Sequence, residues 1–223
     1  FGDFEPLNDG LDKSQVESVL LRGDGQHLAV TLDMSDYELH GNRGTHILVT
    51  DSGDRKRLED QLTFGLFYDR LTQLPNRTLL LDRITRSLLA CQHDEHIGIL
   101  LVDVNRFRSI NERFGHQFGD QLLVTWATRL RRCLQPTDTL ARIGVDDFAI
   151  VRSGSPGEGA MMALGREVEE LARHPFRLPR ETINLSATVG IALSEEGETE
   201  AGALLRDGQT ALFQAKSGNR SNN

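Results

Sequence analysis

One stretch near the middle of the chain, Ile97–Val104, constrains the fold more than any other segment. It is a continuous apolar run that is interrupted only where Asp103 stands, one residue before its end. A strand that is apolar on both faces is typical of the interior of a sheet that is covered on both sides. We therefore expect residues 97–104 to form a central strand with Asp103 at its carboxyl end.

Helical and strand patterns alternate around this run. Amphipathic helical patterns lie at residues 76–91, 120–134, 164–171 and 203–216. Strand patterns lie at residues 139–143, 148–152 and 183–191. The first two of these strands are joined by Gly144-Val145-Asp146-Asp147, which is typical of a hairpin. This order predicts an α+β fold in which helices wrap a central mixed or antiparallel sheet.

The chain divides into two parts by charge. Residues 1–62 hold 13 acidic and six basic side chains, whereas residues 63–223 hold 20 acidic and 19 basic ones. In the first part, strands are predicted over residues 28–34 and 46–50, and a turn over residues 40–44. A helix over residues 55–67 follows, with a narrow apolar stripe formed by Leu58, Leu62 and Leu66. This stripe packs either on a domain or on a partner helix, and the pattern does not distinguish the two.

The stretch GNRGTHILVTDSGDRKRLEDQL, residues 41–62, resembles the C-terminal end of a PAS sensor domain that runs into a signalling helix. The resemblance implies a partial PAS-like β-region over residues 1–53 and a signalling linker helix over residues 54–68. Residues 69–223 then form the domain that is built around the central strand.

Composition excludes several classes of partner and places the chain in a compartment. A net charge of −8 argues against a general nucleic-acid or anionic-membrane binder. No apolar run approaches the roughly 20 residues of a membrane span, and no signal peptide is visible. The two cysteines stand far apart without a CxxC neighbour, which argues against a zinc site and favours a reducing cytosol. We therefore expect a cytoplasmic location and, since the chain does not begin with Met, a fragment of a longer protein.

Three carboxylates are candidates for holding a metal ion. Asp103 ends the central strand, and Asp146 and Asp147 stand at the tip of the predicted hairpin. If the hairpin pairs beside the central strand, these acids converge, and converging carboxylates repel each other unless a cation neutralises them. Mg²⁺ prefers such oxygen ligands, and a site of this kind suits phosphoryl chemistry on a nucleotide. The alternative is a polar turn whose aspartates cap the backbone.

Five motifs in order resemble the GGDEF domain, the diguanylate cyclase module. They are DRLTQLPNR (69–77), VDVNRFRSINERFGHQFGD (102–120), ARIGVDDFAIV (141–151), VGIAL (189–193) and ALFQAKSGNRSN (211–222). The resemblance implies a nucleotidyl-cyclase-like palm that binds GTP with Mg²⁺ (or Mn²⁺). It also implies a homodimer in which two facing domains join two GTP molecules into cyclic di-GMP and release pyrophosphate.

The same resemblance assigns roles to residues. It implies metal ligands at Asp103, Val104 (through its carbonyl) and Asp146, and catalytic acids at Asp146 and Asp147. It implies guanine recognition by Asn111 and Asp120. It implies phosphate binding by Phe107 and Arg108, whose turn presents backbone amides, and by Lys216 and Arg220. Among the 19 basic residues of positions 63–223, Lys216 is the only lysine, which is consistent with a point charge for a phosphate group.

Two departures from the family pattern concern activity. The signature Gly-Gly-Asp/Glu-Glu-Phe reads Gly144-Val145-Asp146-Asp147-Phe148 here, and Asn105 replaces an aspartate that many members carry. A β-branched Val145 resists a left-handed backbone, and Asp147 is one methylene shorter than Glu. At a further position, Gln135-Pro136-Thr137-Asp138 replaces the Arg-x-x-Asp of the inhibitory product site. Gln135 cannot form a charge-assisted bidentate pair, so we expect no such site, although Asp138 is retained.

Three functional hypotheses follow. The first is a regulatory module that binds GTP with impaired or absent cyclase turnover, within a longer PAS–GGDEF–EAL protein. The second is an active diguanylate cyclase that tolerates Val145 and Asp147. The third is a dimerisation scaffold without nucleotide that uses the leucine stripe of residues 58–66.

Overall fold

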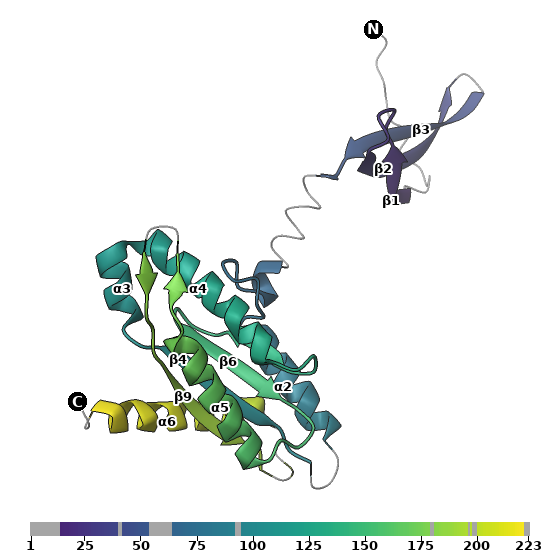
Figure 1. The fold of residues 1–223 in the computed structure, drawn as a ribbon. Coiled ribbons are helices and arrows are strands. Elements are labelled where there is room, and N and C mark those ends of the chain that lie inside the picture. Colours follow the sequence, from purple (N-terminus) through teal and green to yellow (C-terminus); the bar gives the residue numbers. More distant parts are fainter. Residues whose placement is uncertain are drawn as a thin grey trace. The chain divides into compact units, whose positions relative to one another are not determined.

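The computed structural model describes residues 14–39, 42–53, 64–91, 95–178, 181–195, 197 and 200–220. The chain forms two compact units, Phe1–Phe64 and Gly65–Asn223, and each is described by itself (Figure 1). Within the described ranges, no helix combines the length and the apolar character that a membrane crossing requires.

The first unit is a three-stranded antiparallel sheet. Its strands, in the order β1-β2-β3, are β1 (Ser14–Leu21), β2 (His27–Leu39) and β3 (Asn42–Asp51). The register places Val16 opposite Leu32 and Leu32 opposite Val49, so apolar residues of all three strands share one face. The two predicted strands are present within β2 and β3. β1 was not predicted, because its apolar residues 16, 19, 20 and 21 do not alternate with period two.

Much of the predicted connection between the units lies outside the described residues. This applies to Leu58 and Leu62 of the leucine stripe. Within the first unit, residues 40–41 of the predicted turn also lie outside the described residues, whereas residues 42–44 belong to β3. Leu66, the third residue of the stripe, lies in a short helical segment at residues 64–67 and is exposed. The assignment of residues 1–53 to a PAS-like domain and of residues 54–68 to a signalling helix stays a prediction.

The second unit is built on a four-stranded sheet. Its strands, in the order β5-β6-β4-β9, are β5 (Thr139–Arg142), β6 (Asp147–Arg152), β4 (Gly98–Val104) and β9 (Ala187–Leu193). All neighbouring pairs are antiparallel. β4 is an interior strand and every one of its residues is buried, which confirms the predicted central strand.

Helices cover both faces of this sheet (Figure 1). They are α2 (Arg77–Ala90), α3 (Phe107–Phe114), α4 (His116–Leu130), α5 (Glu158–Arg173) and α6 (Ala201–Arg220). Successive residues of β4 point to opposite layers. Ile99 and Leu101 pack with α2 and α6, whereas Leu100 and Val102 pack with α4 and α5. This two-sided burial explains why the run is apolar without alternation, and the predicted α+β class is confirmed.

Two regions of the second unit differ from the predicted elements. α3 precedes α4, and a single-turn helix, η1 (Arg131–Cys133), follows it. The predicted strand over residues 183–191 is interrupted: β7 (Phe176–Arg177) and β8 (Thr182–Ile183) form a small hairpin, and β9 begins only at Ala187. The backbone amide of Asn105 donates to the carbonyl of Ser186 at 3.0 Å, which extends the pairing of β4 with β9 by one residue.

α6 packs directly on β9 at Gly190. A Cβ at this position would lie 2.6 Å from Cα of Leu212 and 2.7 Å from the carbonyl oxygen of Gly208, which are helix backbone atoms. Gly190→Ala therefore forces α6 away from the sheet, and we expect it to lower the free energy of unfolding by about 1–3 kcal/mol.

Urea unfolding followed by tryptophan fluorescence tests this expectation. Trp126 is the only tryptophan, and it is fully buried in the second unit, so its signal reports on that unit. Gly159→Ala is the matched control, since a Cβ at Gly159 meets no atom within 4 Å. Equal stability of the two variants would contradict the tight packing of α6.

Candidate nucleotide and metal site

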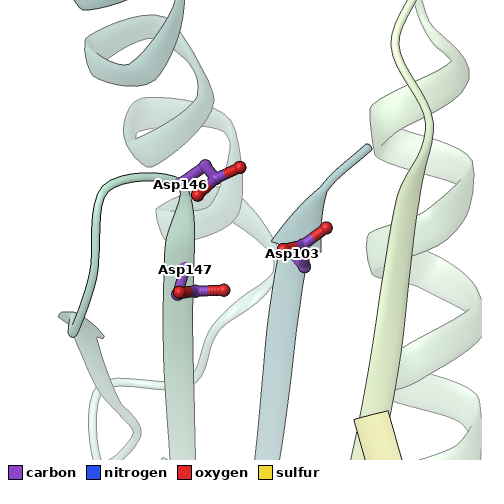
Figure 2. A group of neighbouring side chains, drawn as sticks. All are labelled: Asp103, Asp146 and Asp147. Carbon is purple, nitrogen blue, oxygen red and sulfur yellow. The ribbon is translucent and has the colours of Figure 1, made fainter. Parts of the chain in front are cut away.

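Three carboxylates gather at one end of the two interior strands of the second unit. β4 and β6 are antiparallel, and their register pairs Asp103 with Asp147, so the carboxyl end of β4 lies beside the amino end of β6. Asp146 directly precedes β6. One carboxylate oxygen from each of the three residues lies within 4.8 Å of the others (Figure 2). The three side chains, called the acid cluster below, thus converge as the hairpin pattern predicts.

The acid cluster is costly to ionise fully. Burial, followed by the charges of Asp146 and Asp103, raises the pKa of Asp147 to about 6. Burial and the charge of Asp103 also raise the pKa of Asp146. Three carboxylate oxygens at this spacing are hard ligands of the kind that Mg²⁺ and Mn²⁺ prefer. The residues present therefore fit a divalent cation.

The raised pKa of Asp147 predicts a pH dependence of stability without metal. The pKa of the Asp147 carboxyl is 3.8 in the unfolded chain and about 6 in the folded one. The stability that this group contributes is therefore complete below about pH 4 and is lost as the pH rises through about 6. In EDTA at about pH 8, we expect Asp147→Asn to be more stable than the wild type by about 1 kcal/mol, after discounting for solvent screening.

Thermal unfolding at about pH 4 and about pH 8 measures this effect, and the gain should nearly vanish at the lower pH. Asp82→Asn serves as control, since Asp82 is a surface acid on α2 that pairs with Arg86. An equal gain at both pH values would contradict the raised pKa.

Lys216 supplies a positive charge to the acid cluster. Its Nζ lies 2.5 Å from Oδ2 of Asp103. α6 carries this lysine and is held against the sheet at Gly190 and Gly208. The resemblance implies that Lys216 binds phosphate, but its ion pair with Asp103 was not predicted.

The hairpin before Asp146 is held by an arginine that received no role from the sequence. Arg142 donates to the carbonyl of Val145 from Nε and Nη2, at 3.2 and 2.6 Å, and from Nη1 to both carboxylate oxygens of Asp69. Asp69 in turn accepts from the amide and hydroxyl of Thr72. Both Arg142 and Asp69 lie inside the family-like motifs, which is the only signal in the sequence that singles them out.

The expected strain at Val145 is absent. Neither Gly144 nor Val145 has a positive φ, and the side chain of Val145 is 67% exposed. The β-branched residue therefore meets no backbone penalty, and this expectation was wrong. Gly144 is the constrained position instead, because a Cβ there would lie 2.5 Å from Oδ2 of Asp147.

A cavity of about 1340 Å³ adjoins the acid cluster, and most of the residues predicted to bind phosphate or metal line it. Among its lining residues are Asp103, Val104, Phe107, Arg108, Asp146 and Lys216. Phe107 and Arg108 were expected in a turn, but they open α3. The turn is formed by Asn105 and Arg106, and Arg106 takes a left-handed φ of 59°. The side chain of Arg108 is exposed and pairs with Glu112.

The turn at Asn105 is tied to β9 by side chains as well as by the backbone. The Asn105 amide donates to Oγ of Ser186 and accepts from Oγ1 of Thr188, at 3.0 and 2.9 Å. Thr188 is buried. The residue that replaces the family aspartate therefore fixes the start of α3, a role that the sequence did not reveal.

The two predicted guanine ligands lie at the junction of α3 and α4, and neither lines the cavity described above. Oδ1 of Asn111 is buried and accepts no hydrogen bond from the described residues. The Asn111 side chain lies against Gly119, next to the exposed Asp120. Asn111 thus has an unused acceptor. Arg220 belongs to α6, but its side chain lies outside the described part of the structure.

Asp138, the retained residue of the inhibitory motif, is already engaged inside the domain. Arg152 donates from Nε to its Oδ1 at 3.0 Å and from Nη2 to its Oδ2 at 2.6 Å. The backbone amide of Gln135 donates to the same carboxylate. The Asp138 side chain has no exposed surface.

The chain is similar to known proteins in sequence and in fold. Residues 66–222 match the family model described as "Diguanylate cyclase, GGDEF domain". The cyclic di-GMP phosphodiesterase PdeR of Escherichia coli is 32% identical over 171 residues, which are 77% of this chain and 26% of that protein. The diguanylate cyclase TpbB of Pseudomonas aeruginosa is 36% identical over 165 residues, which are 72% of this chain and 38% of that protein. The chain thus spans well under half the length of these relatives.

A solved structure of the GGDEF domain of TpbB (YfiN) from Pseudomonas aeruginosa is similar in fold. It has a TM-score of 0.65 and 35% identity, and the match covers 68% of this chain and 89% of that one. The central antiparallel sheet wrapped by helices is thus the palm-like fold of these domains. With the family model matching more than half of its length, the chain belongs to the GGDEF diguanylate cyclase family.

Proposed function

We propose that this chain is a nucleotide-binding module of cyclic di-GMP signalling whose GGDEF domain binds GTP with Mg²⁺ or Mn²⁺ and turns it over slowly or not at all. The observation that carries the proposal is the convergence of Asp103, Asp146 and Lys216 on one cavity, with Asp147 within 4.8 Å of the other two acids. Negative and positive groups side by side suit a metal-bound triphosphate, whereas a dimerisation scaffold would need neither.

Each part of the site has a proposed task. Asp103, Asp146 and the carbonyl of Val104 hold the cation, which neutralises phosphate charge when it is bound. Lys216 and Arg220, together with the amides of Phe107 and Arg108 at the start of α3, hold the phosphates. Asn111 and Asp120 accept hydrogen bonds from the guanine edge, a task consistent with the unused acceptor of Asn111. Asp147 is the proposed acceptor of the proton of the attacking 3′-hydroxyl.

Slow turnover is supported by the length of one side chain. Asp147 is one methylene shorter than the glutamate of the family signature, and it is held close to Gly144 and Asp103. Its carboxylate therefore reaches less far toward a bound substrate. Product inhibition at the family's secondary site is not expected, since Arg152 already binds the carboxylate of Asp138.

An active diguanylate cyclase is the second candidate, and one observation favours it. Val145 introduces no backbone strain and points its side chain into solvent, so one of the two departures in the signature is mild. For catalysis, two GGDEF domains would have to face each other. A PAS-like sensor before residue 54 and a phosphodiesterase (EAL) domain elsewhere in the protein are proposed partners, and the cytoplasm is the proposed location. The name of the relative PdeR, a cyclic di-GMP phosphodiesterase, is consistent with the proposed phosphodiesterase domain.

Isothermal titration calorimetry with a non-hydrolysable GTP analogue and Mg²⁺ tests the proposal. We expect binding by the wild type and a loss of at least about tenfold in affinity for Asp120→Ala and Asp103→Ala, the size of one charged hydrogen bond. Asp82→Ala, which removes a surface acid on α2, is the matched control. Absence of heat with the wild type would contradict nucleotide binding and leave the scaffold. Chromatography of products at high protein concentration separates the module from the active cyclase.

A further inference from the structure

Lys216 has a second relation to the site besides phosphate binding. We propose that its ammonium group is a built-in counter-ion of the acid cluster, which occupies Asp103 until nucleotide arrives and so makes divalent-cation binding depend on nucleotide. This inference rests on the proposed function of the same site.

The ion pair is positioned by the fold. Asp103 ends the buried strand β4, and its side chain is only 12% exposed, whereas that of Lys216 is 38% exposed. α6 cannot slide freely, because its backbone contacts Gly190 of β9 and Gly208 packs against side chains of β4. The lysine is therefore aimed at the cluster by the packing of its helix, unlike a surface lysine that samples many partners.

The charges of the cluster identify Lys216 as its counter-ion. Asp103, Asp146 and Asp147 place three carboxylates within 4.8 Å. Among the ion pairs formed by described side chains, only that of Lys216 includes a member of this cluster. In the absence of a divalent cation, the ammonium group thus provides the nearest compensation for carboxylates that repel each other.

A divalent cation and this ammonium group compete for the same oxygen atoms. A cation bound to Asp103 would lie within a few ångströms of Nζ, where unit charges interact strongly even in a solvated site. Lys216 also lines the cavity that contains Phe107 and Arg108 at the start of α3. An ammonium group that leaves Asp103 therefore remains in reach of phosphates bound there. Bound phosphates thus favour the state in which Lys216 has left Asp103 and the carboxylate is free for the cation. By thermodynamic linkage, nucleotide then raises the affinity for metal by the same factor by which metal raises the affinity for nucleotide.

Binding of Mn²⁺ alone, measured by the electron paramagnetic resonance signal of the free ion, tests the inference without nucleotide. We expect Lys216→Met to bind Mn²⁺ about tenfold more tightly than the wild type, from removal of one adjacent positive charge. Arg206→Met is the matched control, because it removes an exposed charge of the same helix that pairs with Glu200. The control should bind like the wild type. Lys216→Gln provides a second variant, and the Trp126 unfolding signal verifies that each variant is folded.

Two outcomes separate this inference from the function on which it rests. If Asp103→Ala abolishes Mn²⁺ binding but both Lys216 variants bind no more tightly than the wild type, the counter-ion role is overturned and the metal site stands. If Asp103→Ala binds Mn²⁺ as the wild type does, the metal site itself is overturned, and the counter-ion role with it.

Discussion

Asp147→Glu is expected to raise the rate of cyclic di-GMP formation by about 100-fold, because a misplacement of about 1 Å at a reacting group has an effect of that size. The added methylene extends the carboxylate by about 1.3 Å from the start of β6, in line with ordinary bond lengths. Gly144, which leaves room for the carboxylate of residue 147, is already present. The longer acid can therefore be accommodated without rebuilding the hairpin.

Val145→Gly is the informative comparison. Val145 is exposed and its backbone is unstrained. We therefore expect this change alone to alter the rate of cyclic di-GMP formation by less than about threefold, as for most surface substitutions. Product chromatography at high protein concentration measures both variants, and Asp146→Ala in each background should abolish product. Activity that returns with Val145→Gly and not with Asp147→Glu would show that the second signature position limits turnover.

The elements that the sequence predicted are those whose patterns are local. Residues 97–104 are apolar on both faces because α2 and α6 cover one side of β4 and α4 and α5 the other. Asn76 caps α2 by accepting a hydrogen bond from the backbone amide of Leu79, as Asn commonly does before a helix. α3 was missed because it is only eight residues long, and Gly115, with a φ of 86°, separates it from α4. A stripe of so few apolar residues carries little periodicity.

The acid cluster could be predicted because a hairpin that pairs beside the central strand brings residues 146–147 to the end of β4 through strand register alone. The ion pairs around the cluster could not be predicted from the sequence. Arg142 and Asp69 stand 73 positions apart, and Lys216 and Asp103 meet only because α6 packs on the sheet. No local pattern encodes such contacts. The prediction of strain at Val145 was wrong because it assumed a left-handed backbone in the signature turn, and neither Gly144 nor Val145 has a positive φ.

The ion pair of Arg152 and Asp138 is expected to have the largest effect on stability. Arg152 binds both carboxylate oxygens of Asp138, whose side chain is 0% exposed, while that of Arg152 is 14% exposed. Arg152→Met would leave a buried carboxylate without its cation, and breaking such a pair destabilises by about 3–5 kcal/mol. The hydrogen bonds that Arg152 donates to Asp138 also raise the pKa of Arg152, so the guanidinium stays charged.

A double-mutant cycle distinguishes loss of the pair from loss of packing. Asp138→Asn removes the charge that Arg152→Met leaves unpaired, so the double variant should be more stable than Arg152→Met alone by about 1–3 kcal/mol. Urea unfolding followed by Trp126 fluorescence gives all four free energies. Arg173→Met, which breaks an exposed pair with Glu170, is the control and should change stability by less than about 1 kcal/mol. A loss for Arg152→Met as small as that of the control would show that Asp138 is solvated, and would reopen this position to a ligand.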